Sequence, residues 1–74
     1  MLSSSDTLNA AIRYHQAGQL SEAEQLYREI LQQEPCQEKV MYLLGLASHQ
    51  NGDLAIASEW YQQALAVNPN YIDV

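Results

Sequence analysis

The sequence repeats itself at an offset of 34 residues, and this internal repeat governs every other inference about the fold. At this offset residues 4–37 align with residues 38–71, and eight positions are identical. The identical residues are His15, Gln16, Gly18, Leu20, Ala23, Tyr27, Leu31 and Pro35, which recur as His49, Gln50, Gly52, Leu54, Ala57, Tyr61, Leu65 and Pro69. A period of this length is typical of stacked helical units, each of which contacts only its neighbours.

Each copy is predicted to contain two helices, and the second helix has the clearer pattern. Its apolar residues fall at the spacing of one helical face, with polar residues on the opposite face. The apolar faces comprise Ala23, Leu26, Tyr27, Ile30 and Leu31 in the first copy, and Ala57, Trp60, Tyr61, Ala64 and Leu65 in the second. The polar faces comprise Glu22, Gln25, Glu29 and Gln32, and Ser58, Glu59, Gln62 and Gln63.

Glycine and proline mark where these helices end. Gly18 and Gly52 are expected to adopt the left-handed turn that follows the first helix of each copy. Pro35 and Pro69 are expected to stop the second helix of each copy. The sequence therefore predicts four antiparallel helices, broken near Gly18, at residues 34–37 and near Gly52.

Polar residues near the helix starts suggest how the second helices are capped. Ser21 and Glu24 have the spacing of a capping box, and Asp53 lies near the start of the corresponding helix in the second copy. Glu24 and Arg28 are also four residues apart, which predicts a surface ion pair worth about 0.3 kcal/mol. The carboxylates in general are expected to lie on exposed helix faces.

With this pattern the chain resembles the tetratricopeptide repeat, whose signature runs W-x2-L-G-x2-Y…A-x3-F…P. The second copy matches with Leu44-Gly45, Ala57, Tyr61 and Pro69. The first copy matches with Tyr14, Ala23, Tyr27 and Pro35, and has Ala10-Ala11 in place of Leu-Gly. The two copies depart from the signature at Thr7 and Met41, in the tryptophan place, and the second copy departs at Ser48, in the second tyrosine place.

This resemblance implies an all-α fold of two tandem helix-turn-helix repeats that form a short α-solenoid. We expect the units to span residues 4–37 and 38–71. Residues 1–3 are expected to form a disordered N-terminus. Residues 72–74 are expected to be the start of a truncated third repeat, or a tail.

In this family the first helix of each unit lines a concave groove that binds extended peptides or partner helices. The positions that carry over to this groove are Leu8, Asn9, Ile12, His15, Lys39, Tyr42, Leu43, Leu46 and His49, flanked by Ser5, Gln16 and Gln50. The segment 38–51 is apolar almost all round, and the alternative to a groove is that adjoining helices bury these residues. If a groove exists, the best candidates to form it are Leu8, Ile12, Tyr42 and Leu46.

The resemblance implies a non-catalytic protein–protein interaction scaffold in the cytoplasm, with no cofactor. The alternative is the amino-terminal repeat segment of a larger enzyme, such as a glycosyltransferase with these repeats, in which the segment positions a substrate. Asn9 and Lys39 are too few donors for the clamp with which some members bind carboxylates. Asn9 is matched by Leu43, so the asparagine ladder of other members is not sustained.

Composition excludes several other classes of function. A formal net charge of −6 would repel nucleic acid. No apolar run approaches the ~20 residues that span a bilayer, and the first residues do not resemble a signal peptide. Cys36 is the single cysteine and cannot form an internal disulfide. His15 and His49 lack a third ligand, so we predict no metal site.

Two repeats bury little surface, so we expect the chain either to be a piece of a longer array or to have its open end covered by another copy. The isolated chain is expected to self-associate. Trp60, Ala64 and Val67 are predicted to form an apolar stripe at the open end of the array. A homodimer, or an exchange of the last helix between copies, would cover this stripe.

Overall fold

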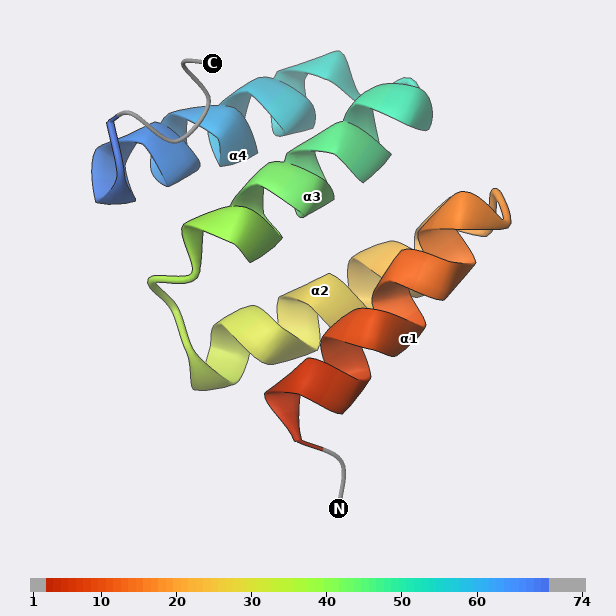
Figure 1. Cartoon of the computed structure of the whole chain (residues 1–74). Coiled ribbons are helices and arrows are strands. Elements are labelled where there is room, and N and C mark those ends of the chain that lie inside the picture. The colour runs from red at the N-terminus through yellow and green to blue at the C-terminus, as the bar shows by residue number, and fades with distance from the viewer. Residues whose placement is uncertain (1–2, 70–74) are drawn as a thin grey trace.

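The computed structural model describes residues 3–69, and every regular element in that part of the chain is a helix. The helices are α1 (Ser4–Gln16), α2 (Leu20–Gln33), α3 (Glu38–Gln50) and α4 (Leu54–Val67), shown in Figure 1. The predicted breaks are confirmed. The predicted end of the second unit at residue 71 and the segment 72–74 lie outside the described residues.

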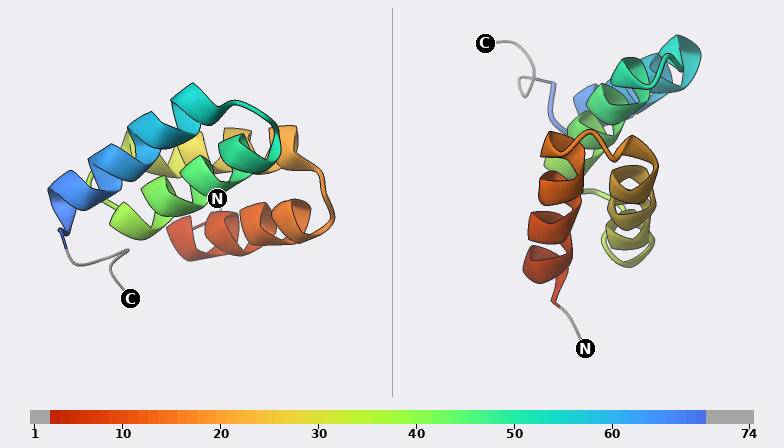
Figure 2. Two further views of the ribbon diagram at one scale, coloured as in Figure 1. Left: turned by 90° about the horizontal axis from the view of Figure 1, so that it is seen from above. Right: turned by 90° about the vertical axis from the view of Figure 1, so that its right-hand side faces the viewer.

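The four helices form two hairpins, and consecutive helices make the main contacts. The hairpin of α3 and α4 is tilted against the hairpin of α1 and α2 (Figure 2). Helices α1 and α3 lie toward the viewer in Figure 1, and α2 lies behind them. The arrangement is the all-α helical-hairpin solenoid expected from the repeat.

The turn inside each hairpin depends on a glycine with positive φ. Gly18 has a φ of 82°, and Gly52 has a φ of 89°. The Gly18 N–H donates to the carbonyl of His15 at 3.1 Å, and the Gln19 N–H donates to the carbonyl of Tyr14 at 2.9 Å. These two bonds form a Schellman motif, which satisfies carbonyls at the end of α1, and the same pair recurs after α3.

Substitution of Gly18 tests the contribution of this backbone conformation. A Cβ atom at Gly18 would meet no atom within 4 Å, so steric contact adds nothing. Gly18→Ala should therefore cost only the left-handed backbone strain, about 1–2 kcal/mol less a small gain from the stiffer unfolded chain. We expect thermal denaturation to show a Tm lower by several degrees. Gly18→Asn should lose less, because asparagine tolerates this conformation better than alanine does. An equal loss for both variants would contradict this explanation.

The predicted capping box at Ser21 is wrong. Helix α2 begins at Leu20, its N-cap is Gln19, and no side chain caps it. The Schellman motif ends at Gln19, the non-helical N-cap, and α2 begins at the next residue, Leu20, so the helix has already begun before Ser21. Asp53 is the N-cap of α4, as its position indicated, although its side chain makes no capping hydrogen bond.

The N-cap of α1 lies in the segment that the sequence predicts to be disordered. Ser3 is the N-cap, and its Oγ accepts a hydrogen bond from the backbone N–H of Asp6 at 3.2 Å. The Thr7 hydroxyl donates to the carbonyl of Ser3 at 3.1 Å. Ordered structure therefore extends to Ser3, and residues 1–2 lie outside the described part.

The core lies where α1, α2 and α3 meet. Its fully or nearly fully buried members are Ala11, Ala23, Tyr27, Ile30, Val40, Leu44 and Ala47. The residues predicted for the apolar face of α2 all contribute to this cluster or pack against it. The predicted apolar face is therefore confirmed for α2.

A carboxylate is buried between the two repeats, contrary to the prediction that the acidic residues are exposed. Glu24 is only 8% exposed, because α3 covers it. Ser48 is completely buried, and its hydroxyl donates to Glu24 Oε1 at 3.2 Å. Arg28 Nη2 lies 4.0 Å from the same oxygen, so the predicted ion pair exists at the edge of this buried contact. The small Ser48, where the family has tyrosine, leaves room for the glutamate.

The stripe predicted for self-association does not form a continuous exposed surface. Ala64 is completely buried, and Trp60 packs partly buried against the core cluster. Only Val67, at 40% exposure, matches the prediction. Helix α4 turns Ala64 inward and leaves Trp60 only partly exposed, so the three residues do not present one apolar surface.

The Leu-Gly pair of the second repeat marks a close approach of α3 and α4. A Cβ atom on Gly45 would lie 2.7 Å from Cε1 of Tyr61 and 3.2 Å from the carbonyl oxygen of Ala57. These distances explain why the second repeat has glycine at this position.

Candidate interaction groove

A groove lies on the side of the molecule formed by α1 and α3, with a volume of about 260 Å³. Its lining residues are Ile12, His15, Gln16, Tyr27, Lys39, Leu43 and Leu46. Ile12 comes from α1, whereas Leu43 and Leu46 come from α3, and all three are half-buried. The apolar part of the lining therefore spans both repeats.

The imidazole of His15 is held between the two repeats. His15 Nδ1 lies 3.0 Å from the hydroxyl of Tyr27 in α2, and His15 Nε2 lies 2.6 Å from Oε1 of Gln50 in α3. A neutral imidazole with its proton on Nε2 satisfies both contacts: Nε2–H donates to Gln50, and the Tyr27 hydroxyl donates to Nδ1. Both ring nitrogens thus have partners, and the ring is fixed beside the groove.

Tyr27 forms part of the groove from behind. Burial raises the pKa of Tyr27 to about 12, so its hydroxyl stays protonated and able to donate at neutral pH. The rings of Tyr27 and His15 meet edge to face, with centroids 6.0 Å apart. Sequence reasoning assigned Tyr27 to the core alone. The repeat itself hinted at a contact between these two residues, because His15 and Tyr27 recur together as His49 and Tyr61.

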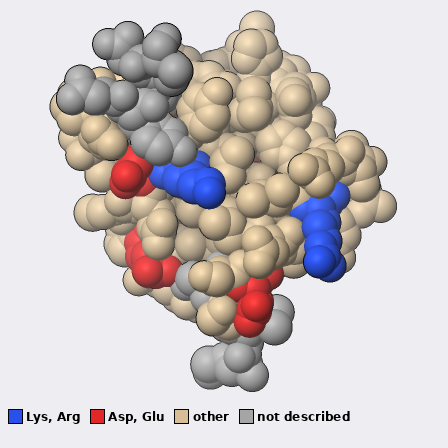
Figure 3. Space-filling view, viewed as in Figure 1, with Lys and Arg blue, Asp and Glu red and all other residues tan. Residues whose placement is uncertain are grey.

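The face that carries the groove is mostly uncharged. Figure 3, viewed from the side of α1 and α3, shows wide areas without acidic or basic side chains. Lys39 is exposed and lies at the rim of the groove. In a chain with a net charge of −6, this ammonium is the cation that a ligand in the groove would meet.

The structure places the remaining predicted site residues outside the groove lining. Leu8 packs against the core and lines a smaller hollow of about 110 Å³ with Ile30 and Val40. Asn9 and His49 are exposed on α1 and α3. The structure therefore brings together Ile12, His15, Lys39, Leu43 and Leu46, but not Leu8, Asn9, Tyr42 and His49.

Tyr42 contacts the second helix of its own hairpin. Its ring centroid lies 5.6 Å from that of Tyr61, with the ring planes tilted by 39°. Burial, and to a lesser extent the neighbouring Tyr42, raises the pKa of Tyr61. Tyr42 thus helps to join α3 to α4, and truncating it would disturb packing as well as any bound ligand.

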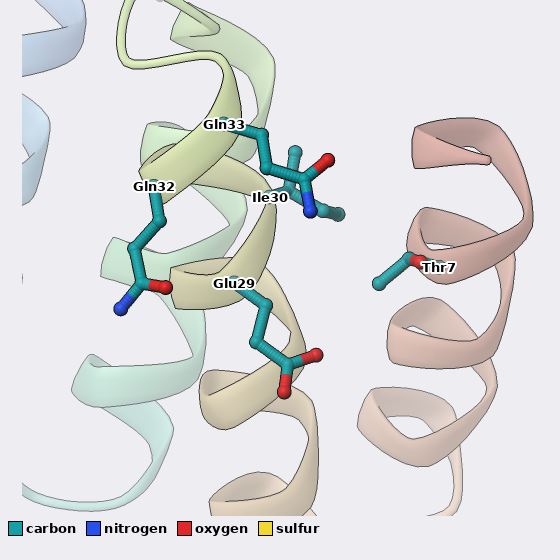
Figure 4. Close-up of a pocket in the computed structure, with 5 residues that line it drawn as sticks. All are labelled: Thr7, Glu29, Ile30, Gln32 and Gln33. Atoms are coloured by element: carbon teal, nitrogen blue, oxygen red, sulfur yellow. The ribbon is translucent and has the colours of Figure 1, made fainter. Parts of the chain in front are cut away.

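A second hollow, of about 370 Å³, lies between the start of α1 and the end of α2 (Figure 4). It is lined by Thr7, Glu29, Ile30, Gln32 and Gln33. Ile30 is almost completely buried, so polar side chains provide the exposed lining. Binding sites for peptides and small molecules usually need apolar anchors, which the groove between α1 and α3 has and this hollow lacks.

Residues 3–69 were predicted to contain no metal site, no disulfide and no membrane-spanning segment, and the structure describes each of these features as follows. No three His, Cys, Asp or Glu side chains in this range are grouped so that they could hold a metal ion. Cys36 is an exposed free cysteine in the loop between α2 and α3. Among these residues, no helix is both long enough and apolar enough to cross a bilayer.

A model of a known protein family matches most of the chain. The model described as the tetratricopeptide repeat matches residues 14–74. The match includes α2, α3 and α4 together with the turn after α1.

Proposed function

The chain belongs to the tetratricopeptide repeat family, whose repeats mediate protein–protein interactions, and we propose that it binds a peptide or a partner helix in the groove between α1 and α3. In this proposal it acts as a non-catalytic scaffold, without a cofactor. The observation that carries the proposal is the groove lining, in which apolar side chains from both repeats lie beside polar groups at the rim.

The groove offers three kinds of contact to a ligand. Ile12, Leu43 and Leu46 are half-buried, so an apolar side chain of the ligand could cover the part of each that remains exposed. The fixed ring of His15 adds a rigid wall, which would cost little conformational entropy when a ligand binds. Lys39 at the rim favours ligands with a carboxylate near the apolar contact.

Peptides selected from a displayed random library with this chain as bait provide the test. Leu46→Ala should weaken binding of the selected peptides by about 5–30-fold, which corresponds to the ~1–2 kcal/mol lost when an apolar contact is truncated. Lys39→Glu should weaken peptides that carry a carboxylate and have less effect on neutral ones. Fluorescence polarisation measures the affinities, and circular dichroism checks that both variants remain helical.

Leu54→Ala is the matched control for Leu46→Ala. It makes the same substitution at a residue of α4 that is absent from the groove lining. Its affinity for the selected peptides should equal that of the unmodified chain. Peptides that bind Leu46→Ala and Leu54→Ala equally well would place the ligand elsewhere and overturn the proposal.

A further inference from the structure

Residues of α4 are more exposed than the equivalent residues of α2, and these exposed residues form one face of α4. Tyr27 is completely buried and Leu20 is half-buried, whereas the equivalent Tyr61 is half-buried and Leu54 is 62% exposed. The cause is α3, which packs on α2, while no described helix packs on α4 in the same way. We call this uncovered face of α4 the tail face; it consists of Leu54, Ser58, Tyr61 and Leu65.

We infer that a second copy of this chain covers the tail face with its own α1, so that the packing of α3 on α2 is repeated between copies. The surface of α1 that would dock is called the head face; it consists of Ala10, Arg13, Tyr14 and Ala17. These residues are the equivalents of Leu44, Ala47, Ser48 and Asn51 in α3. In this arrangement α1 of one copy packs on α4 of another in the same way as α3 packs on α2 within one chain.

The strongest support comes from the hydrogen bond that joins the repeats. His15 Nε2 of the first repeat bonds to Gln50 Oε1 of the second, at 2.6 Å. The equivalent of His15 in the second repeat is His49, and the equivalent of Gln50 in the first is Gln16. Both His49 and Gln16 are exposed. Head-to-tail docking brings His49 of one copy to Gln16 of the next, which reproduces the inter-repeat bond between chains.

The buried polar pair gives a second, steric argument. Inside the chain the long side chain of Glu24 faces the small Ser48. At the equivalent positions of a head-to-tail contact, the small Ser58 faces the long Tyr14. In the internal contact the large residue is on the second helix of a repeat, and in the proposed contact it is on the first helix. One large and one small residue meet in both cases, so the two faces remain complementary in size.

A hollow on α1 can receive side chains of the tail face. Its volume is about 380 Å³, and it is lined by Ala10, Arg13, Tyr14, Ala17 and Gln19. In the second repeat Leu44 occupies the place of Ala10 and is completely buried. The antiparallel pairing seen between α2 and α3 would place Leu54 of another copy beside Ala17, at the edge of this hollow.

Charge makes this contact weaker than the internal one. Val40 and Ala47 are buried in α3, whereas their equivalents in α1 are the charged residues Asp6 and Arg13. Two chains that each carry a net charge of −6 also repel each other at long range. Added salt screens this repulsion, so association should strengthen as the ionic strength rises.

Contact between two different faces does not close on itself. Each chain that docks through its head face still has a free tail face, so open chains of copies form with increasing concentration. This arrangement differs from the symmetric homodimer, and from the exchanged helix, that the sequence led us to expect.

Two variants, each blocking one face, provide the test by sedimentation equilibrium of the 74-residue chain. The unmodified chain should show a weight-average mass that rises with concentration beyond that of two chains. Leu54→Glu, which blocks the tail face, and Tyr14→Glu, which blocks the head face, should each remain monomeric. An equimolar mixture of the two variants should form a species of two chains and grow no further, because one intact head face and one intact tail face remain.

Matched controls separate the contact from the added charge. Gln63→Glu adds the same charge on the exposed side of α4 away from the tail face, at the place where the first repeat has Glu29, and should associate as the unmodified chain does. His49→Ala and Gln16→Ala should each weaken association several-fold. Circular dichroism confirms that each variant is folded.

Three results would overturn the inference. The first is an unmodified chain that stays monomeric at high micromolar concentration and high salt. The second is a Tyr14→Glu variant that still dimerises while Leu54→Glu does not, which would indicate a symmetric contact between two α4 helices. The third is a mixture of the two variants that remains monomeric.

Discussion

Replacement of Leu44 with alanine should lower the free energy of unfolding by about 2–5 kcal/mol, the usual cost of such a cavity in a protein core. Leu44 is completely buried in the cluster where α1, α2 and α3 meet. A chain of 74 residues is expected to have a total stability of roughly 4–11 kcal/mol. This one substitution therefore removes a large share of the stability, and in the lower part of that range the chain would be largely unfolded at 25 °C.

Urea denaturation followed by the helical circular dichroism signal measures this effect. Leu54→Ala is the matched control, because it makes the same chemical change at a side chain that is mostly exposed. Its unfolding free energy should change by no more than about 0.5 kcal/mol, as at other surface positions. Measurement at low micromolar concentration keeps any association of the chains from contributing. Similar losses for the two variants would mean that Leu44 does not hold the core together.

Gly45→Val should destabilise the chain by about 2–3 kcal/mol, a cost in the range for overpacking a close contact. The new side chain would meet the ring of Tyr61 and the carbonyl oxygen of Ala57. The half-buried ring can swing aside, but the carbonyl belongs to the backbone of α4 and can move only with that helix. Thermal and urea denaturation should both register the loss.

A double-mutant cycle identifies the ring as part of the cause. Tyr61→Ala alone should destabilise the chain, because it removes packing between α3 and α4. In the presence of Tyr61→Ala, however, Gly45→Val should cost less than it does in the unmodified chain, because the clashing ring is gone. Additive costs would show that the valine acts through helix α3 itself.

The helices and their ends could be predicted from the sequence because they depend on local chemistry. Gly18 and Gly52 have the positive φ that a repeated glycine at a helix end implies. The apolar face of α2 was evident from its spacing alone. The capping box at Ser21 failed because a competing local motif, the turn at Gly18, places the N-cap at Gln19, two residues before Ser21.

Errors were larger where burial depends on a helix from elsewhere in the chain. Glu24 looks like a surface residue in the periodicity of α2, and only the position of α3 buries it against Ser48. Ser48 in turn looked like a departure from the family signature, yet it is the residue that makes space for the glutamate. Ala64 belongs to the stripe predicted to be exposed, but it is completely buried because α4 turns it inward.

The groove was predicted in part. Its residues from α1 and α3 belong to the wider set carried over from the family's concave surface. Of the four best candidates, Ile12 and Leu46 line it, whereas Leu8 and Tyr42 do not. The role of Tyr27 was missed, because it comes from α2, lines the groove behind the residues of α1 and α3, and is bonded there to His15. Helical spacing relates residues along one helix and does not reveal contacts of this kind. The binding role of the groove stays a prediction.

The dominance of contacts between consecutive helices bears on how the chain folds. Each hairpin joins segments that are close in sequence, so little loop-closure entropy is lost before its contacts form. Such a topology of low contact order favours folding on the microsecond to millisecond timescale. Either hairpin can serve as the nucleus, and the contact of α2 with α3 then couples the two into one cooperative transition. Substitutions at Glu24 or Ser48 therefore act on this cooperativity as much as on stability.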